Sequence, residues 1–206
     1  TAQIVAVFRN LASSEPKRGF TIGINDDVTN LSLPVQPLDD FKDADTYSCK
    51  FWGLGGDGTV GANHNTIRIL GDCADMYAQA YFEYDSKKSF GVTKSHLRLS
   101  KKPIRSTYYV KRADFVACHN QSYVRQYDMV QEVKPGGTFL LNTGWTAEEL
   151  DTNLPGAMKR CIASNGIRLF TVDAVEIAHR VGLGSHINTV LQAAFFKISG
   201  LMPVEE

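Results

Sequence analysis

The chain contains 206 residues, of which 43% are apolar, and its 22 basic residues are balanced by 22 acidic ones. This length and apolar content allow a substantial core in one large α/β domain or two small ones, and they exclude a largely disordered chain. The balanced charge argues against a nucleic-acid scaffold, and the sequence has no apolar run approaching the ~20 residues of a membrane span. We therefore expect neither a nucleic acid nor a membrane as partner.

The beginning of the chain and its cysteines predict the compartment. Residues 1–19 lack the charged lead and the cleavage site of a signal peptide. Cys49, Cys73, Cys118 and Cys161 are scattered, with no C-x-x-C pair. This spacing does not predict a zinc site or an iron–sulfur cluster, and isolated cysteines with apolar neighbours are typical of buried thiols in a reducing cytoplasm. We expect a cytoplasmic protein whose chain holds no metal and no redox centre.

Residues 1–45 predict an N-terminal arm or linker, because their polar, proline-containing sequence does not suit a closed core. The elements expected in this arm are a short helix or connecting segment at 1–12, a strand at 20–24, an extended linker at 28–38 and a solvated acidic stretch at 39–45. Residues 46–206 form the second predicted domain.

The second domain has strand-then-helix units. Residues 113–118, ADFVAC, predict a short buried strand of the kind expected in a parallel sheet. Residues 92–99 alternate between polar and apolar side chains, which predicts an exposed strand. Further strands are expected at 50–52, 76–84, 106–110, 138–142 and 167–172, and helices at 60–70, 122–131, from Thr146, at 155–164, 173–181 and 188–198. The order predicts an α/β fold with a mainly parallel, Rossmann-like sheet and helices on its faces.

A glycine-rich turn lies between the strand at 50–52 and the helix at 60–70. Gly53, Gly55 and Gly58 satisfy G-x-G-x-x-G. Glycine allows positive φ and close approach of a ligand, and the N-terminus of the following helix attracts anions. The turn predicts a phosphate-bearing cofactor, although a β-to-α turn that binds nothing gives the same pattern.

Two strands end in polar residues at the edge where ligands of parallel sheets collect. Asn142 ends the strand at 138–142, and His119 and Asn120 follow the strand at 113–118. Asn120 and Asn142 are candidate ligand amides. His119 fits either a general base or a hydrogen-bonded loop residue, and the second interpretation is favoured for a lone histidine. The spacing contains no catalytic triad and no carboxylate pair, so we predict no catalytic residue.

Several long motifs carry a resemblance to a known family. They are WGLGGDGTVGANHN, YAQAYFEYDSKKS, VTKSHLRL, PIRSTY, ADFVACHN, KPGGTFLLN and GLGSHIN. Together and in this order they resemble the gamma domain, the coenzyme A-associated domain III, of pyruvate:ferredoxin (flavodoxin) oxidoreductases, which are 2-oxoacid oxidoreductases. The resemblance covers nearly the whole chain.

The resemblance implies a role in the oxidative decarboxylation of pyruvate to acetyl-CoA, with electrons passed to ferredoxin or flavodoxin. It places thiamine diphosphate, its Mg²⁺ and the [4Fe-4S] clusters in partner domains or subunits, and coenzyme A on this chain. The isolated chain is therefore expected to be inactive as an oxidoreductase.

The resemblance also implies which residues hold coenzyme A. The turn would hold its phosphates through backbone N–H groups and a threonine hydroxyl, with Asp57 more suited to capping the helix. A basic loop would contact the 3′-phosphate of the ribose. The complete predicted set is Gly55, Gly56, Asp57, Gly58, Thr59, Lys87, Lys88, Asn142, His186 and Asn188.

Two other interpretations stay open. In the first, the domain is a non-catalytic scaffold that packs against the thiamine and cluster domains. In the second, it binds an NAD(P)-type dinucleotide, with Glu83 or Asp85 as the acid that contacts the ribose. Lys87 and Lys88 count against NAD itself.

Overall fold

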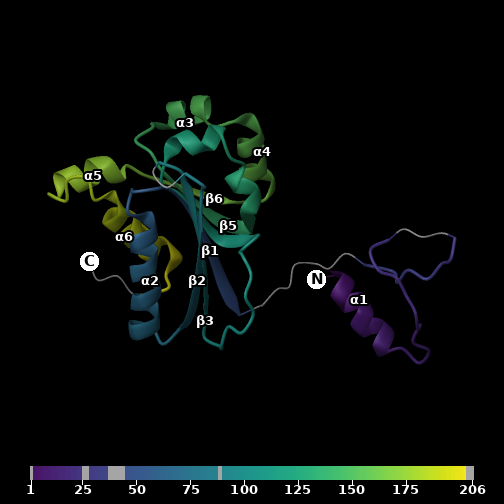
Figure 1. Ribbon diagram of the computed structural model, residues 1–206. Helices are drawn as coiled ribbons and strands as arrows, with labels where there is room; N and C mark the ends of the chain where they lie inside the picture. The colour runs from purple at the N-terminus through teal and green to yellow at the C-terminus, as the bar shows by residue number, and fades with distance from the viewer. Residues whose placement is uncertain (1, 25–27, 37–44, 88–89, 203–206) are drawn as a thin grey trace. The chain divides into compact units, whose positions relative to one another are not determined.

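The computed structural model describes residues 2–24, 28–36, 45–87 and 90–202 (Figure 1). The chain divides into two compact units, residues 1–44 and 45–206, which are described separately. The prediction for Lys88 and that for the acidic stretch up to residue 44 lie outside the described residues.

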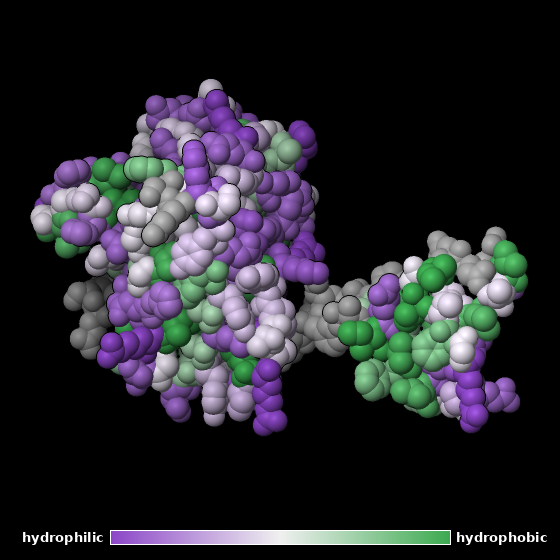
Figure 2. All heavy atoms as spheres, in the orientation of Figure 1, coloured by the Kyte–Doolittle hydropathy of each residue, from purple (hydrophilic) through white to green (hydrophobic). Residues whose placement is uncertain are grey.

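The N-terminal unit contains one described helix, α1 (Ala2–Leu11). The strand expected at 20–24 is wrong: the described part forms only an isolated bridge between Thr21 and Ser32. Ile4, Phe8 and Leu11 share one helix face at i, i+4 and i+7, and each is more than 60% exposed. Figure 2 shows apolar side chains gathered on the surface of this unit.

The second unit is built on a six-stranded sheet, which confirms the predicted α/β class. The strand order is β2-β3-β1-β4-β5-β6. β1, β4, β5 and β6 are parallel to one another, and β3 is antiparallel to both of its neighbours. The strands are β1 (Thr46–Leu54), β2 (Tyr77–Tyr84), β3 (Val92–Ser100), β4 (Ala113–Cys118), β5 (Val133–Asn142) and β6 (Arg168–Val172).

Helices cover both faces of this sheet (Figure 1). On one face α2 (Thr59–Cys73) and α6 (Ile187–Ser199) pack Leu70, Phe195 and Phe196 against Phe51 and Phe115. On the other face α4 (Gly156–Ser164) packs with the 3₁₀ segments η1 (Gln121–Arg125) and η2 (Met129–Glu132). The remaining helices are α3 (Ala147–Asn153), with a capping box between Thr146 and Glu149, and α5 (Ala174–Arg180).

β3 is buried, not exposed as its alternating pattern suggested. His96 and Arg98 lie on its polar face and are only 2% and 1% exposed. The segment predicted as a strand at 106–110 has no regular structure. Instead it covers this polar face: Arg98 donates to the carbonyl oxygen of Ser106 and lies 3.7 Å from the ring centre of Tyr108, and Val110 N–H donates to Nδ1 of His96.

Two further predictions are corrected in detail. The helix expected at 122–131 consists of the separate 3₁₀ segments η1 and η2. The turn expected at 134–137 belongs to β5, where the pairing with β4 shifts register between Ala113 and Phe115. Both differences result from tertiary packing, which cannot be predicted from the local propensity of a segment.

Candidate functional site

The glycine turn connects the end of β1 to the start of α2. Gly56 and Gly58 have φ angles of 99° and 83°, in the left-handed region that glycine adopts without strain. A Cβ atom at Gly58 would lie 3.0 Å from Nδ2 of Asn188 in α6. The turn therefore requires glycine for its own geometry and for the close packing of α6.

Asp57 ties the turn to the helix. Its carboxylate oxygens accept hydrogen bonds from Leu54 N–H and Thr59 N–H, each at 2.8 Å. The interpretation of Asp57 as a group that caps the helix start fits this geometry, because one of the first free amides of α2 is satisfied by its side chain.

Thr59 turns its hydroxyl inward. The Oγ1 atom of Thr59 lies 2.7 Å from Nδ1 of His119, and both residues are buried. Burial lowers the pKa of His119 to about 4, an effect partly opposed by the negative charge of Asp57. His119 is therefore neutral near pH 7, and the Thr59 hydroxyl faces the imidazole.

A pocket of about 630 Å³ lies between the turn and the β2–β3 hairpin. Its walls are residues 54–58 with Val60 and Gly61 on one side, and residues 84–87 and 91–93 on the other. Two backbone hydrogen bonds connect the two walls of the pocket. Gly55 N–H donates to Gly91 O at 2.7 Å, and Phe90 N–H donates to Gly55 O at 3.3 Å. The structure thus brings the predicted turn and Lys87 together in one cavity.

Two helix N-termini lie at this end of the sheet. Asn188 is next to Gly58, and four residues later Gln192 donates to Ala62 O at 3.0 Å and to Thr66 Oγ1 at 2.8 Å. α6 therefore runs beside α2 in the same direction, and the positive ends of both helix dipoles coincide. The amides of Val60 and Gly61 in the first turn have no acceptor within α2. This arrangement suits an anion.

The charged side chains of the pocket have both signs. Lys87 contributes an ammonium, whereas Asp57 and Asp85 contribute carboxylates. Tyr84 and Thr93 also line the pocket and were missed, because only the pairing of β2 with β3 places them there. Positive charge in the described part of the site therefore comes from Lys87 and the helix ends.

The remaining predicted residues are not in the pocket lining. Asn142 is buried, and its side chain donates to His119 O at 2.9 Å and accepts from Ala174 N–H at 3.0 Å, so it connects β4 to α5. Asn120 caps η1 by accepting from Ser122 N–H. His186 is exposed at the start of α6.

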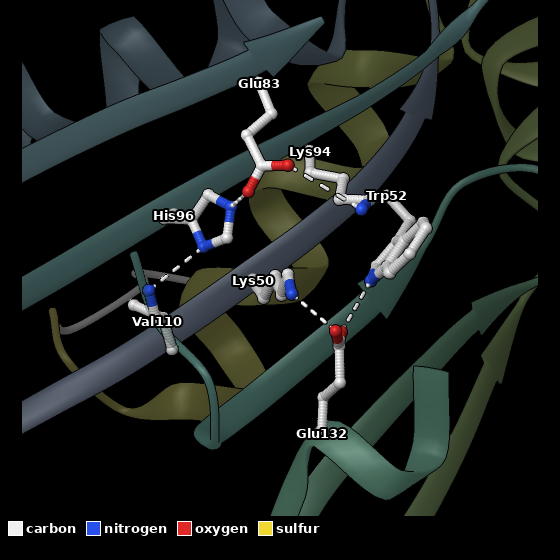
Figure 3. A network of polar contacts seen from close by, with 7 residues as sticks. All are labelled: Lys50, Trp52, Glu83, Lys94, His96, Val110 and Glu132. Carbon is white, nitrogen blue, oxygen red and sulfur yellow. Dashed lines mark hydrogen bonds and ion pairs between the residues drawn. The ribbon is translucent and has the colours of Figure 1, made fainter. Parts of the chain in front are cut away.

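A second polar cluster lies on the opposite face of the sheet from α2 (Figure 3). Glu132 accepts from Lys50 at 2.5 Å and from the Trp52 indole at 3.1 Å. Glu83 accepts from Nε2 of His96 at 2.6 Å, and Lys94 lies 4.6 Å from the ring centre of Trp52. Because Val110 N–H donates to Nδ1 of His96, that ring is the neutral Nε2–H tautomer. These contacts connect side chains of β1, β2, β3 and η2 on one face of the sheet.

The described residues offer neither a metal-binding group nor a membrane-spanning helix. Among the described residues, no group of three or more His, Cys, Asp or Glu side chains is arranged to hold a metal ion. Within the same residues, no helix has the length and apolar character needed to cross a bilayer.

Comparison with known sequences finds a family model over the second unit and relatives that align with the whole chain. Residues 48–206 match the family model of pyruvate ferredoxin/flavodoxin oxidoreductase. The chain is 55% identical over 205 residues to the pyruvate:ferredoxin oxidoreductase of Moorella thermoacetica. That alignment covers 100% of this chain and 18% of the relative, so the chain spans about a fifth of the relative's length.

Comparison with solved structures gives the same fold. A pyruvate oxidoreductase subunit from Thermotoga maritima matches with a TM-score of 0.59 at 19% identity, over 77% of this chain and 79% of that one. The 2-oxoglutarate:ferredoxin oxidoreductase of Magnetococcus marinus, solved with 2-oxoglutarate, coenzyme A and succinyl-CoA bound, matches with a TM-score of 0.55 at 15% identity. This match covers 74% of this chain and 24% of that one.

Proposed function

Because the chain belongs to the pyruvate ferredoxin/flavodoxin oxidoreductase family, we propose that the pocket at its glycine turn binds coenzyme A. One observation carries the proposal: the glycine turn and Lys87 line the same cavity although they are far apart in the sequence. A turn that served only to connect β1 with α2 would not need a basic loop opposite it.

The parts of the pocket match the parts of the ligand. The amides of Val60 and Gly61, with the coincident helix ends, suit the diphosphate. Lys87 suits the 3′-phosphate, and Asp85 suits the neighbouring ribose 2′-hydroxyl as an acceptor. Thr59 and Asn142 hold the backbone around the site through the hydrogen bonds described above, and Asn188 packs against the turn.

The wider role is proposed from the family. The chain would present coenzyme A to the oxidative decarboxylation of pyruvate, with thiamine diphosphate and iron–sulfur clusters held by partner domains and electrons leaving to ferredoxin or flavodoxin. The neighbour from Magnetococcus marinus, which has the same fold, was solved with coenzyme A bound. On this proposal the purified chain reduces no dye with pyruvate and added thiamine diphosphate.

Calorimetry tests the ligand. We expect the chain to bind coenzyme A more tightly than dephospho-coenzyme A, and Lys87→Ala to weaken coenzyme A by about tenfold, since a charge-assisted contact is lost. Dephospho-coenzyme A should bind both proteins alike. Lys101→Ala is the matched control, because Lys101 is exposed and lies outside the pocket lining.

The other possible results of the titration favour one of the alternative interpretations or contradict the assignment of Lys87. Binding of NAD in preference to coenzyme A favours the dinucleotide interpretation, in which Asp85 contacts the ribose. Absence of heat with every ligand favours a scaffold role. Equal affinity for coenzyme A and its dephospho form would contradict the assignment of Lys87.

A further inference from the structure

Phe90 has an unusual backbone conformation. Among the described residues, three that are not glycine have positive φ: Asn30 at 52°, Asp75 at 49° and Phe90 at 60°. Asn and Asp adopt the left-handed region at little cost because their short polar side chains bond locally, whereas a bulky residue is strained there. Phe90 is therefore the one strained residue of the three.

The ring of Phe90 does not stabilise the fold in return. Phe90 is 79% exposed, more than any of the other aromatic residues among the described exposed ones. An apolar side chain stabilises the folded state in proportion to the area that it removes from water, and this ring removes little. Strain that folding does not require points to a role in binding.

The backbone of Phe90 lies at the rim of the pocket. Its N–H donates to Gly55 O in the glycine turn at 3.3 Å, and the next residue, Gly91, lines the cavity. A Cβ at Gly91 would lie 2.6 Å from Lys87 O, so Gly91, next to Phe90, packs closely against the backbone of Lys87. At the other end of this loop Tyr84 lines the pocket and is 65% exposed. Two exposed aromatic residues thus flank the loop that carries Lys87.

We propose that Phe90 is a specificity-determining residue whose ring stacks on the purine base of the nucleotide bound in this pocket. The inference rests on the proposed function, in which Lys87 contacts the 3′-phosphate. The base is attached to that same ribose, so it emerges near the loop. An exposed aromatic ring recognises a flat base by stacking, and it gains burial only when the ligand is present.

Three substitutions of Phe90 separate the effect of its aromatic ring from the effect of its backbone strain. Phe90→Tyr keeps both, Phe90→Ala removes the ring and keeps the left-handed strain, and Phe90→Gly removes both. We expect Phe90→Ala and Phe90→Gly to weaken coenzyme A by about tenfold and Phe90→Tyr to bind like the wild type. Phe90→Gly should raise Tm by about 2 °C, because relief of strain exceeds the added entropy of the unfolded chain.

The full chain is titrated with coenzyme A and with 4′-phosphopantetheine, which keeps one phosphate but lacks the ribose and the base. Weakening of coenzyme A alone supports the inference, and equal weakening of both ligands contradicts the assignment to the base. Asp75→Gly is the matched control: it should leave coenzyme A affinity unchanged. If the wild type binds coenzyme A and Lys87→Ala weakens it while Phe90→Ala and Phe90→Gly do not, this inference fails and the proposed function stands. If the wild type binds no coenzyme A, both fail.

Discussion

The Oγ1 atom of Thr59 lies 2.7 Å from Nδ1 of His119, which joins the first residue of α2 to the end of β4 inside the core. His119 also offers its carbonyl oxygen to Asn142 at 2.9 Å. Buried polar groups therefore hold the base of the glycine turn. The protonation state of one of them, His119, affects the stability of the fold.

The first prediction concerns acid stability. Burial lowers the pKa of His119 to about 4, and an unfolded histidine has a pKa near 6.5. Between these values the unfolded chain binds a proton that the folded chain does not, so the free energy of unfolding falls as pH falls through this window. His119 alone should cost about 2 kcal/mol between about pH 7 and about pH 4.5, measured by urea unfolding.

His119→Gln isolates this contribution. The variant cannot titrate, so its stability should fall less than that of the wild type over the same pH range. Burial also lowers the pKa of His96, so a residual dependence of the same sign is expected. An unchanged pH slope in His119→Gln would show that another group is responsible.

Local patterns predicted most of the sheet but not its polar face. The mostly apolar segment at 113–118 predicted β4 without alternation, because a strand buried on both faces needs none. The run at 106–110 has equally strong strand propensity, yet it lies irregularly over β3 because buried Arg98 and His96 bind its backbone. Propensity does not identify which charged side chains will be buried.

The glycine turn of the candidate site was predictable because it is local in sequence. The spacing of the glycines identified the turn, because its geometry depends on φ angles that glycine supplies. The contribution of Thr93 to the pocket depends on its pairing with Tyr84 across the hairpin, which no motif encodes. Asn142 looked like a ligand amide from its place at a strand end, but both of its polar atoms bind backbone groups.

The second prediction concerns the charge of Asp57. Its carboxylate lines the pocket and repels phosphate, so Asp57→Asn should tighten coenzyme A by about threefold in calorimetry at low salt. An amide accepts through one oxygen only, so one of the bonds to Leu54 and Thr59 is lost and stability should fall by about 1 kcal/mol. Asp151→Asn, outside the pocket lining, removes the same charge and should leave affinity unchanged. Weaker binding in Asp57→Asn would mean that the carboxylate contacts the ligand.

The third prediction concerns Lys50 and Glu132, whose charged atoms lie 2.5 Å apart with side chains 6% and 24% exposed. Glu132→Ala leaves the ammonium of Lys50 buried without its partner and should cost about 3–5 kcal/mol of unfolding free energy. Lys50→Met should cost less, because Glu132 keeps the bond from Trp52 and some contact with water.

Urea unfolding of both variants tests this difference, because the loss of unfolding free energy depends on which charged side chain remains buried without its partner. The exposed pair Arg68–Asp72 is the control: its side chains are 82% and 71% exposed, so Asp72→Ala should change stability little. Equal losses in Glu132→Ala and Lys50→Met would contradict the argument, because burial of the unpaired ammonium would then not be the dominant cost.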